Sequence, residues 1–247
     1  MRDHRQIFGI GGTFYNEPWE RPLLQQHMLG LVKVSQPRIA FLGTATGDSA
    51  ADIERFYRAM AAHRCTVSHL NLFEPHTDDF ETYFCAHDIV YVGGGSTRNM
   101  LTLWRDWGID RALRRAWEAG VLMAGTSAGS ICWFEGCITD SLPSRLMPLQ
   151  GLGFIAGSAS THYQGRPDRP SCLRQWVGDG TLPGPAIATE DHVALHYVGV
   201  ELSAIVSARS GAGAYRIERG LNGAIETRLP VVALDTQEAS RSRLTSG

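Results

Sequence analysis

The sequence has little net charge and no excess of basic residues. Its 247 residues include 23 Lys and Arg and 25 Asp and Glu, which gives a formal net charge of −2 at pH 7. Because proteins that bind nucleic acids or anionic membranes rely on a positive field, we expect neither as a partner. The hydrophobic runs are far shorter than the roughly 20 residues of a membrane-spanning helix. The N-terminal residues MRDHRQIFGIGG lack the apolar core of a secretory signal, so the expected location is the cytoplasm.

Disulfide and metal motifs are also missing. The five cysteines form no C-x-x-C pair, and a chain of this length does not need disulfide bonds to stabilise it. His192 and His196 have the spacing of a zinc pair on a helix, but their segment has the pattern of a strand. We therefore expect reduced, partly buried thiols and no metal or organic cofactor.

Strand-like and helix-like segments alternate along the chain. Seven short apolar segments are predicted to be strands: residues 7–10, 38–43, 66–72, 89–92, 121–124, 153–156 and 186–189. Residues 51–63 and 97–119 have helical periodicity, with a break at Gly108. Near-continuous apolar strands separated by helices are typical of a parallel sheet covered on both faces.

After residue 186 the pattern changes to short β-like runs separated by turn signals such as Asn222-Gly223. We interpret these runs as an antiparallel C-terminal extension at one edge of the sheet. The sequence thus predicts one domain over residues 1–247. Its fold class is α/β, with a doubly wound, mostly parallel sheet.

The segment GTSAG at residues 125–129 has the pattern G-x-S-x-G and lies between a predicted strand and a predicted helix. In this context a sharp turn presents the serine hydroxyl as a nucleophile, and only small residues fit beside it. The amide of Ala128 would lie at the helix N-terminus, where it could stabilise an oxyanion. The alternative is a glycine-rich turn in which Ser127 only caps the helix.

A second glycine-rich segment, GGGST at residues 93–97, follows the predicted strand 89–92. It lacks the lysine of a phosphate-binding loop, and residues 9–14 (GIGGTF) do not match the dinucleotide fingerprint. A dinucleotide site is therefore the weaker interpretation. Backbone amides of Gly94 and Gly95 fit better as an oxyanion hole or as substrate-binding groups beside a serine nucleophile.

A serine nucleophile needs a base within hydrogen-bond reach and an acid to orient that base. His162 follows a predicted strand and begins a polar loop, so we favour it as the base, with His192 as the rival. We choose Asp140 as the acid because it follows the predicted nucleophile helix and a turn. Glu135, at the end of that helix, is the alternative, and either carboxylate could simply be a solvated surface group.

Taken in order along the chain, these segments resemble the peptidase E family of aspartyl dipeptidases and their cyanophycinase relatives. The likeness covers nearly the whole chain, at residues 92–97, 125–129, 139–141, 161–163 and 189–191. The resemblance implies a fold like that of the class I glutamine amidotransferases, which is flavodoxin-like. The amidotransferases need a cysteine at the nucleophile position of this turn. Because Ser127 occupies that position, transfer of ammonia from glutamine is not expected.

The same resemblance implies roles for individual residues. Ser127 corresponds to the nucleophile, His162 to the base and Asp140 to the family's acidic position. The Gly94 and Ala128 amides correspond to the oxyanion hole.

The substrates of the peptidase E family carry an aspartyl carboxylate, so the pocket needs a cation. Arg166 and Arg169 lie in the loop after His162, and a guanidinium binds a carboxylate in a bidentate manner. By position, Arg169 best resembles the family's substrate-side arginine. Glu190 could receive the free amino group of the substrate, or it could pair with one of the arginines.

We therefore expect a serine dipeptidase that acts on small peptides with N-terminal Asp, as a monomer or homodimer. One alternative is a cyanophycinase-like hydrolase of β-aspartyl-arginine. Another is a non-catalytic ligand-binding homologue.

Overall fold

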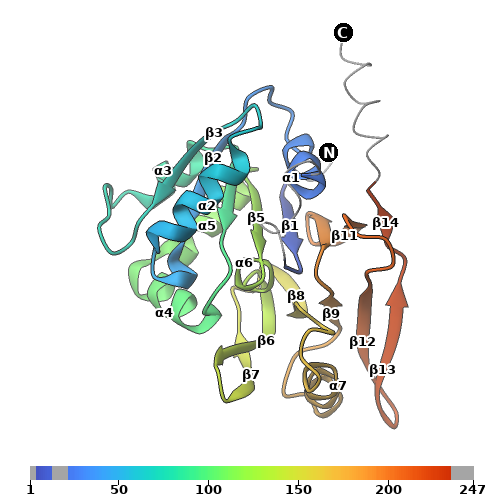
Figure 1. Cartoon of the computed structure of the whole chain (residues 1–247). Helices are drawn as coiled ribbons and strands as arrows, with labels where there is room; N and C mark the ends of the chain where they lie inside the picture. Colours follow the sequence, from blue (N-terminus) through green and yellow to red (C-terminus); the bar gives the residue numbers. More distant parts are fainter. Residues whose placement is uncertain (1–3, 13–21, 235–247) are drawn as a thin grey trace.

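The computed structural model describes residues 4–12 and 22–234, which form two sheets with helices packed on them (Figure 1). The first sheet has the strand order β14-β11-β10-β1-β5-β4-β2-β3. Its five parallel strands match the first five predicted ones: β1 (Gln6–Ile10), β5 (Leu122–Thr126), β4 (Ile89–Val92), β2 (Arg38–Leu42) and β3 (Thr66–Leu70). The strand β10 (Val193–Val198) runs antiparallel to β1, and it is followed by β11 (Glu201–Ser207) and β14 (Val232–Ala233).

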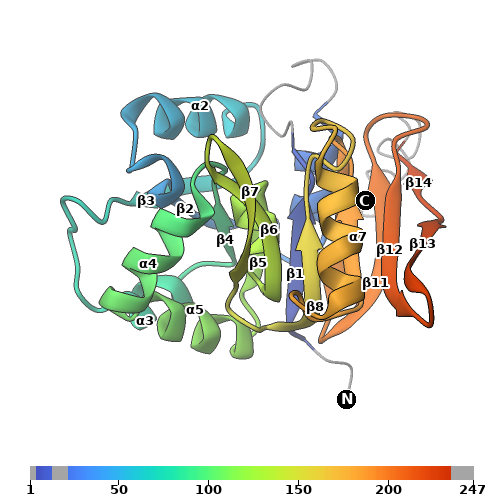
Figure 2. The ribbon, with the colours of Figure 1, turned by 90° about the horizontal axis from the view of Figure 1, so that it is seen from below.

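Both faces of the first sheet are buried. Along β4, Ile89 and Tyr91 pack into one apolar cluster, whereas Val90 and Val92 pack into another. The first cluster includes residues of α1 (Leu23–Gly30) and α2 (Ala50–Met60). The second includes residues of α3 (Phe80–Cys85), α4 (Thr97–Trp107) and α5 (Ile109–Glu118). Helices thus cover both faces of a largely parallel sheet (Figure 2), which confirms the predicted doubly wound α/β class.

The helix boundaries follow from local signals. The predicted break falls at Gly108, whose φ of 74° ends α4 and begins α5. A left-handed conformation of this kind costs glycine little, because glycine has no Cβ. None of the described helices is both long and apolar enough to cross a membrane.

The second sheet has the strand order β13-β12-β9-β8-β6-β7. Its three parallel strands are β6 (Phe134–Leu142), β8 (Ile155–Ser160) and β9 (Ala186–Thr189). Antiparallel strands extend it on both sides: β7 (Arg145–Gln150), β12 (Ala214–Gly220) and β13 (Gly223–Leu229). One face of this sheet shares the core of the first sheet, and the other packs on α7 (Arg169–Asp179).

Two features differ from the sequence prediction. The C-terminal strands do not extend one edge of one sheet, because β10 and β11 join the first sheet while β12 and β13 join the second. The helix after the serine also ends early. The helix α6 (Ala128–Ile131) makes a single turn, and the chain is extended from Phe134 because β6 is held between β7 and β8.

All five cysteines are unpaired thiols. Cys132 and Cys137 are fully buried, and burial raises the pKa of the Cys137 thiol to about 12. Burial likewise raises the pKa of Cys132 well above its usual value. Both side chains are therefore protonated at neutral pH and pack as small apolar groups.

Candidate active site

The nucleophile candidate, Ser127, lies in a strained turn at the end of β5. Its φ of 54° and ψ of −111° are unusual for a residue with a Cβ. The backbone amide of Ser127 donates to the carbonyl of Ile10 at 3.0 Å, which attaches the turn to β1. The strand–turn–helix context predicted for the G-x-S-x-G segment is thus present.

The two glycines of this segment are required by close packing. A Cβ on Gly125 would lie 2.4 Å from the carbonyl oxygen of Gly129, and one on Gly129 would lie 2.2 Å from the carbonyl oxygen of Val92. Both distances are far inside van der Waals contact with backbone atoms that cannot move independently. The turn can therefore press against β4 only with glycine at these positions.

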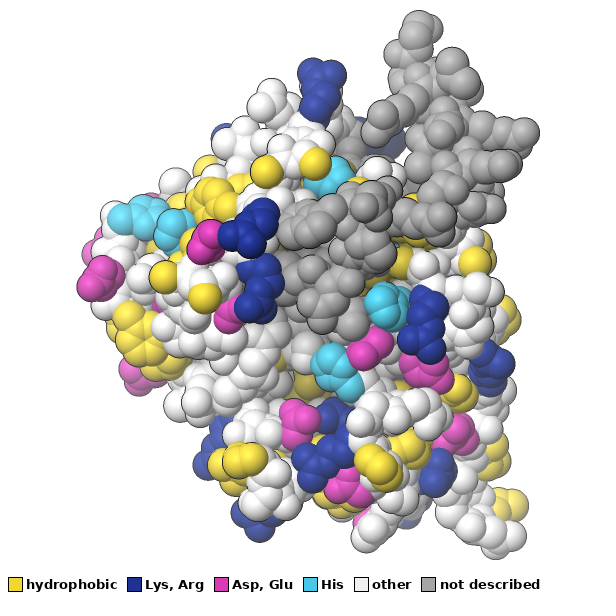
Figure 3. All heavy atoms as spheres, viewed as in Figure 1, with side chains coloured by type: hydrophobic (Ala, Val, Ile, Leu, Met, Phe, Trp, Pro, Cys, Tyr) yellow, Lys and Arg dark blue, Asp and Glu magenta, His cyan; other side chains and the backbone are white. Residues whose placement is uncertain are grey.

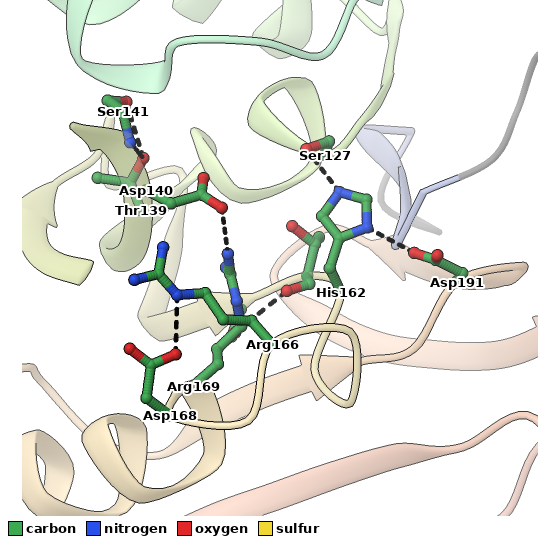
Figure 4. A network of polar contacts seen from close by, with 11 residues as sticks. Ser127, Thr139, Asp140, Ser141, His162, Arg166, Asp168, Arg169 and Asp191 are labelled. Carbon is green, nitrogen blue, oxygen red and sulfur yellow. Dashed lines mark hydrogen bonds and ion pairs between the residues drawn. The ribbon is translucent and has the colours of Figure 1, made fainter. Parts of the chain in front are cut away.

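The histidine beside Ser127 is His162, which follows β8. Its Nε2 lies 2.9 Å from Ser127 Oγ (Figure 4). Its φ of 52° is again positive, and its carbonyl accepts a 2.9 Å hydrogen bond from the amide of Gly165. The rival, His192, lies in the turn after β9, where its carbonyl accepts from the hydroxyl of Ser207. The structure thus brings His162, and not His192, to Ser127.

The other ring nitrogen of His162 contacts Asp191. The distance from His162 Nδ1 to Asp191 Oδ1 is 2.5 Å. This hydrogen bond lowers the pKa of Asp191 below its usual value, against the opposing effect of partial burial. A carboxylate on Nδ1 keeps the proton on that nitrogen, so the lone pair on Nε2 faces the serine hydroxyl. Ser127, His162 and Asp191 form a continuous hydrogen-bonded chain.

The prediction that Asp140 orients His162 is therefore wrong in this structure, and so is the alternative with Glu135. Asp140 Oδ2 accepts a 2.7 Å hydrogen bond from Arg169, and Glu135 Oε2 accepts one of 2.7 Å from the amide of Gly157. Both acids lie on β6, a strand of the second sheet, because the chain does not form the predicted helix and turn there. The sequence did carry a signal for Asp191, since it follows a predicted strand just as Ser127 and His162 do.

Two glycines after β1 make room for the histidine and its acid. A Cβ on Gly12 would lie 2.4 Å from Asp191 Oδ1 and 2.4 Å from His162 Cε1. A Cβ on Gly11 would lie 2.1 Å from the carbonyl oxygen of Glu190. The glycines that failed to match a dinucleotide fingerprint thus allow β1 to pack against the His162–Asp191 pair.

The backbone of Gly94 lies beside the nucleophile. A Cβ on Gly94 would be 3.2 Å from Ser127 Cβ and 3.8 Å from Ser127 Oγ. Ala128 is the first residue of α6, so its amide has no acceptor within the helix. By contrast, Gly95 packs against the short helix η1 (Thr44–Thr46), because its Cβ would lie 2.4 Å from the Ala45 carbonyl oxygen. The backbone at Gly94 and at Ala128 thus lies next to Ser127, whereas Gly95 faces η1.

The arginines of the predicted pocket both form ion pairs. Arg169 is 2% exposed and donates from Nη2 to Asp140, while burial lowers its pKa. Arg166 donates from Nε to Asp168 Oδ1 at 2.8 Å, and its side chain remains 28% exposed. In Figure 4 these pairs lie on the side of His162 away from Asp191. On the face of the molecule seen in Figure 3, basic, acidic and histidine side chains are interspersed near the centre. Neither positive nor negative side chains dominate that region.

Glu190 has other partners than the sequence suggested. Its carboxylate accepts hydrogen bonds from the amide of Gly213 at 3.1 Å and from the Tyr215 hydroxyl at 2.7 Å. Among the described residues no arginine pairs with it. These contacts join the turn that carries Asp191 to β12. Within that same described part of the chain, no cluster of three or more His, Cys, Asp or Glu side chains is arranged to hold a metal ion.

Comparison with known proteins places these features in context. The model of peptidase family S51 matches residues 7–205. The chain is 44% identical over 227 residues to the uncharacterized peptidase YgaJ of Bacillus subtilis (strain 168), covering 92% of this chain and 98% of that protein.

Two crystal structures share the fold. A peptidase from an acI-B1 actinobacterium has a TM-score of 0.69 at 16% identity, with 93% of this chain and 96% of that chain covered. A putative peptidase E protein from Listeria monocytogenes EGD-e has a TM-score of 0.58 at 17% identity, with 92% and 99% covered.

Proposed function

The chain belongs to peptidase family S51, and on this premise we propose that it is a serine exopeptidase that cleaves dipeptides with N-terminal Asp. The observation that carries the proposal is the hydrogen-bonded chain from Ser127 Oγ through His162 to Asp191. A hydroxyl, an imidazole and a carboxylate in this order are the groups that nucleophilic acyl transfer requires.

In the proposed mechanism Ser127 Oγ attacks the peptide carbonyl while His162 Nε2 takes the hydroxyl proton. Asp191 stabilises the imidazolium that forms, and the Gly94 and Ala128 amides stabilise the oxyanion. His162 then gives the proton to the leaving amine as the C–N bond breaks, which leaves an acyl ester on Ser127. Water, deprotonated by His162, hydrolyses the ester and restores the serine.

For specificity we propose two charged side chains, Asp140 and Arg166, which lie on the side of His162 away from Asp191 (Figure 4). Asp140 is paired with buried Arg169 but has a half-exposed side chain, so it can receive the ammonium group of the substrate. This assignment replaces Glu190, whose carboxylate oxygens already accept from Gly213 and Tyr215. Arg166, the more accessible guanidinium, binds the side-chain carboxylate of the N-terminal Asp.

A second substrate class, β-aspartyl-arginine, is favoured by one observation. Asp140, on β6, and Asp168, which precedes α7, present half-exposed carboxylates, and such groups bind a cationic leaving group. A substrate panel separates the two classes, because α-Asp-Leu lacks the guanidinium and β-Asp-Arg contains it.

We expect hydrolysis of Asp-Leu to exceed that of Ala-Leu, Lys-Leu and β-Asp-Arg. Arg166→Gln should raise the KM for Asp-Leu about tenfold, the equivalent of one charge-assisted hydrogen bond, and leave kcat and the Ala-Leu rate nearly unchanged. The measurement is steady-state kinetics on each dipeptide.

Arg174→Gln is the matched control, since Arg174 lies in α7, shortly after Arg166 in the chain, but pairs with Glu226. If Arg166→Gln affected Asp-Leu and Ala-Leu equally, the proposed role of Arg166 would be wrong. Preference for β-Asp-Arg would overturn the aspartyl-dipeptide assignment.

A further inference from the structure

A pocket of about 440 Å³ lies between α5 and the chain that follows β7. Four of its lining residues are arginines of α4 and α5: Arg105, Arg111, Arg114 and Arg115. Ser127, His162 and Asp191 do not line it. The pocket is therefore separate from the proposed active site.

Three of the four guanidinium groups have no carboxylate partner in the described part of the structure. Arg115 pairs with Glu81 at 3.3 Å. Asp110 and Glu118 also line the pocket, but neither forms an ion pair with a described arginine within 4.0 Å. Guanidinium groups stay protonated at every working pH, and the four arginines of the lining outnumber its two carboxylates, Asp110 and Glu118, so the pocket keeps an excess of positive charge.

Neutral groups hold two of the arginines in place. Arg105 Nη2 donates to the carbonyls of Gln150 at 2.8 Å and Gly151 at 3.0 Å. Arg114 Nη2 donates to the carbonyl of Gly153 at 2.8 Å, and its guanidinium lies 4.0 Å from the ring centre of Phe154. Each group uses one nitrogen in these contacts, and a guanidinium has five N–H donors. The remaining donors are thus fixed in position and lack described acceptors.

The chain that holds these arginines also supports the nucleophile turn. The Leu152 amide donates to the Cys132 carbonyl at 2.8 Å, and the Phe154 amide donates to the Trp133 carbonyl at 2.7 Å. Cys132 directly follows α6, which begins next to Ser127. Leu152 and Phe154, which line the pocket, are therefore hydrogen-bonded to the residues that follow α6.

We propose that this pocket binds a small polyanion carrying two or more phosphate or carboxylate groups. Planar guanidinium forks bind such oxygens in a bidentate manner, and arginines fixed beforehand lose little side-chain entropy on binding. A cavity of about 440 Å³ is within the usual size range of small-molecule sites. The unpaired charges of Arg105, Arg111 and Arg114 provide the attraction.

The test is isothermal titration of the full chain with sodium pyrophosphate and with trisodium citrate, at constant ionic strength. We expect saturable binding of one equivalent of at least one probe. Arg111→Gln should raise the Kd about tenfold, because it removes one guanidinium from the pocket. The fold should stay intact, since this guanidinium has no described hydrogen-bond acceptor. Arg114→Lys, which keeps the charge but loses the fork, should also raise the Kd.

Arg64→Gln is the matched control, since it changes the net charge equally at an exposed site that does not line the pocket. Its Kd should equal that of the wild type. Absence of saturable binding for both probes would overturn the proposal, as would an unchanged Kd in Arg111→Gln. Ser127→Ala should bind as the wild type does, so this result is independent of whether the protein hydrolyses peptides.

Discussion

Asp191→Asn is expected to lower kcat by about 10⁴-fold, the size of loss that this substitution causes in a Ser-His-Asp peptidase. The carboxylate of Asp191 accepts the hydrogen of His162 Nδ1, which leaves the Nε2 lone pair facing Ser127 Oγ. An asparagine can donate to Nδ1 and so favours the wrong tautomer. Since the hydrogen bond to His162 lowers the pKa of Asp191, the wild-type carboxylate stays ionised at mildly acidic and neutral pH. Steady-state kinetics on Asp-Leu at neutral pH measures the loss.

Asp140→Asn is the informative control, because the sequence pattern points to Asp140 as the acid. We expect its kcat to fall by less than about tenfold, since Asp140 contacts Arg169 and not His162, whereas its KM for Asp-Leu should rise because Asp140 is proposed to bind the substrate ammonium group. It should lower the thermal stability, because it leaves the charge of buried Arg169 without its partner. Kinetics must therefore be measured well below the melting temperature. A large kcat loss in Asp140→Asn with a small one in Asp191→Asn would contradict the assignment.

Gly12→Ala should lower kcat/KM by about 100-fold or more. The added methyl group would lie 2.4 Å from both Asp191 Oδ1 and His162 Cε1 and 2.8 Å from His162 Nδ1. At least one of these side chains must shift, and a displacement of about 1 Å in a catalytic group costs about 10²-fold in rate. The comparison of kcat/KM between the variant and the wild type gives the size of this effect.

Gly30→Ala serves as its matched control. A Cβ on Gly30 meets no atom within 4 Å, so this variant should keep wild-type activity. Circular dichroism and the melting temperature establish whether Gly12→Ala still folds. A folded Gly12→Ala with wild-type kinetics would show that the geometry of the His162–Asp191 pair does not limit the reaction.

The first sheet could be predicted because its signals are local. Short apolar runs with two buried faces identify β1, β2, β4 and β5, and the glycines around Ser127 identify the turn after β5. The second sheet could be predicted only in part: the predicted strand 186–189 coincides with β9, and the predicted strand 153–156 overlaps the start of β8. The strand β6 follows a single helical turn, and its pairing with β7 and β8 is set by tertiary contacts that its own sequence does not reveal.

The carboxylate that contacts His162 was not predicted, for a related reason. Asp140 is close to Ser127 in sequence, whereas Asp191 lies 64 residues after Ser127. The site forms where the carboxyl ends of β5, β8 and β9 meet, so position at a strand end decides proximity better than separation along the chain. Applied to all three strands, that rule points to the two acids that follow β9, Glu190 and Asp191, and the contact with His162 distinguishes Asp191.

The central claim, that Ser127 is an activated nucleophile, is tested most directly by mass spectrometry after treatment with a fluorophosphonate. The oxygen of a serine that an adjacent base activates attacks the phosphorus of such a reagent. A phosphonyl ester forms, and fluoride leaves. The account predicts one adduct per chain, located on Ser127 by peptide mapping and absent in folded Ser127→Ala. A folded wild-type protein that gains no adduct, or an adduct that persists in Ser127→Ala, would contradict it.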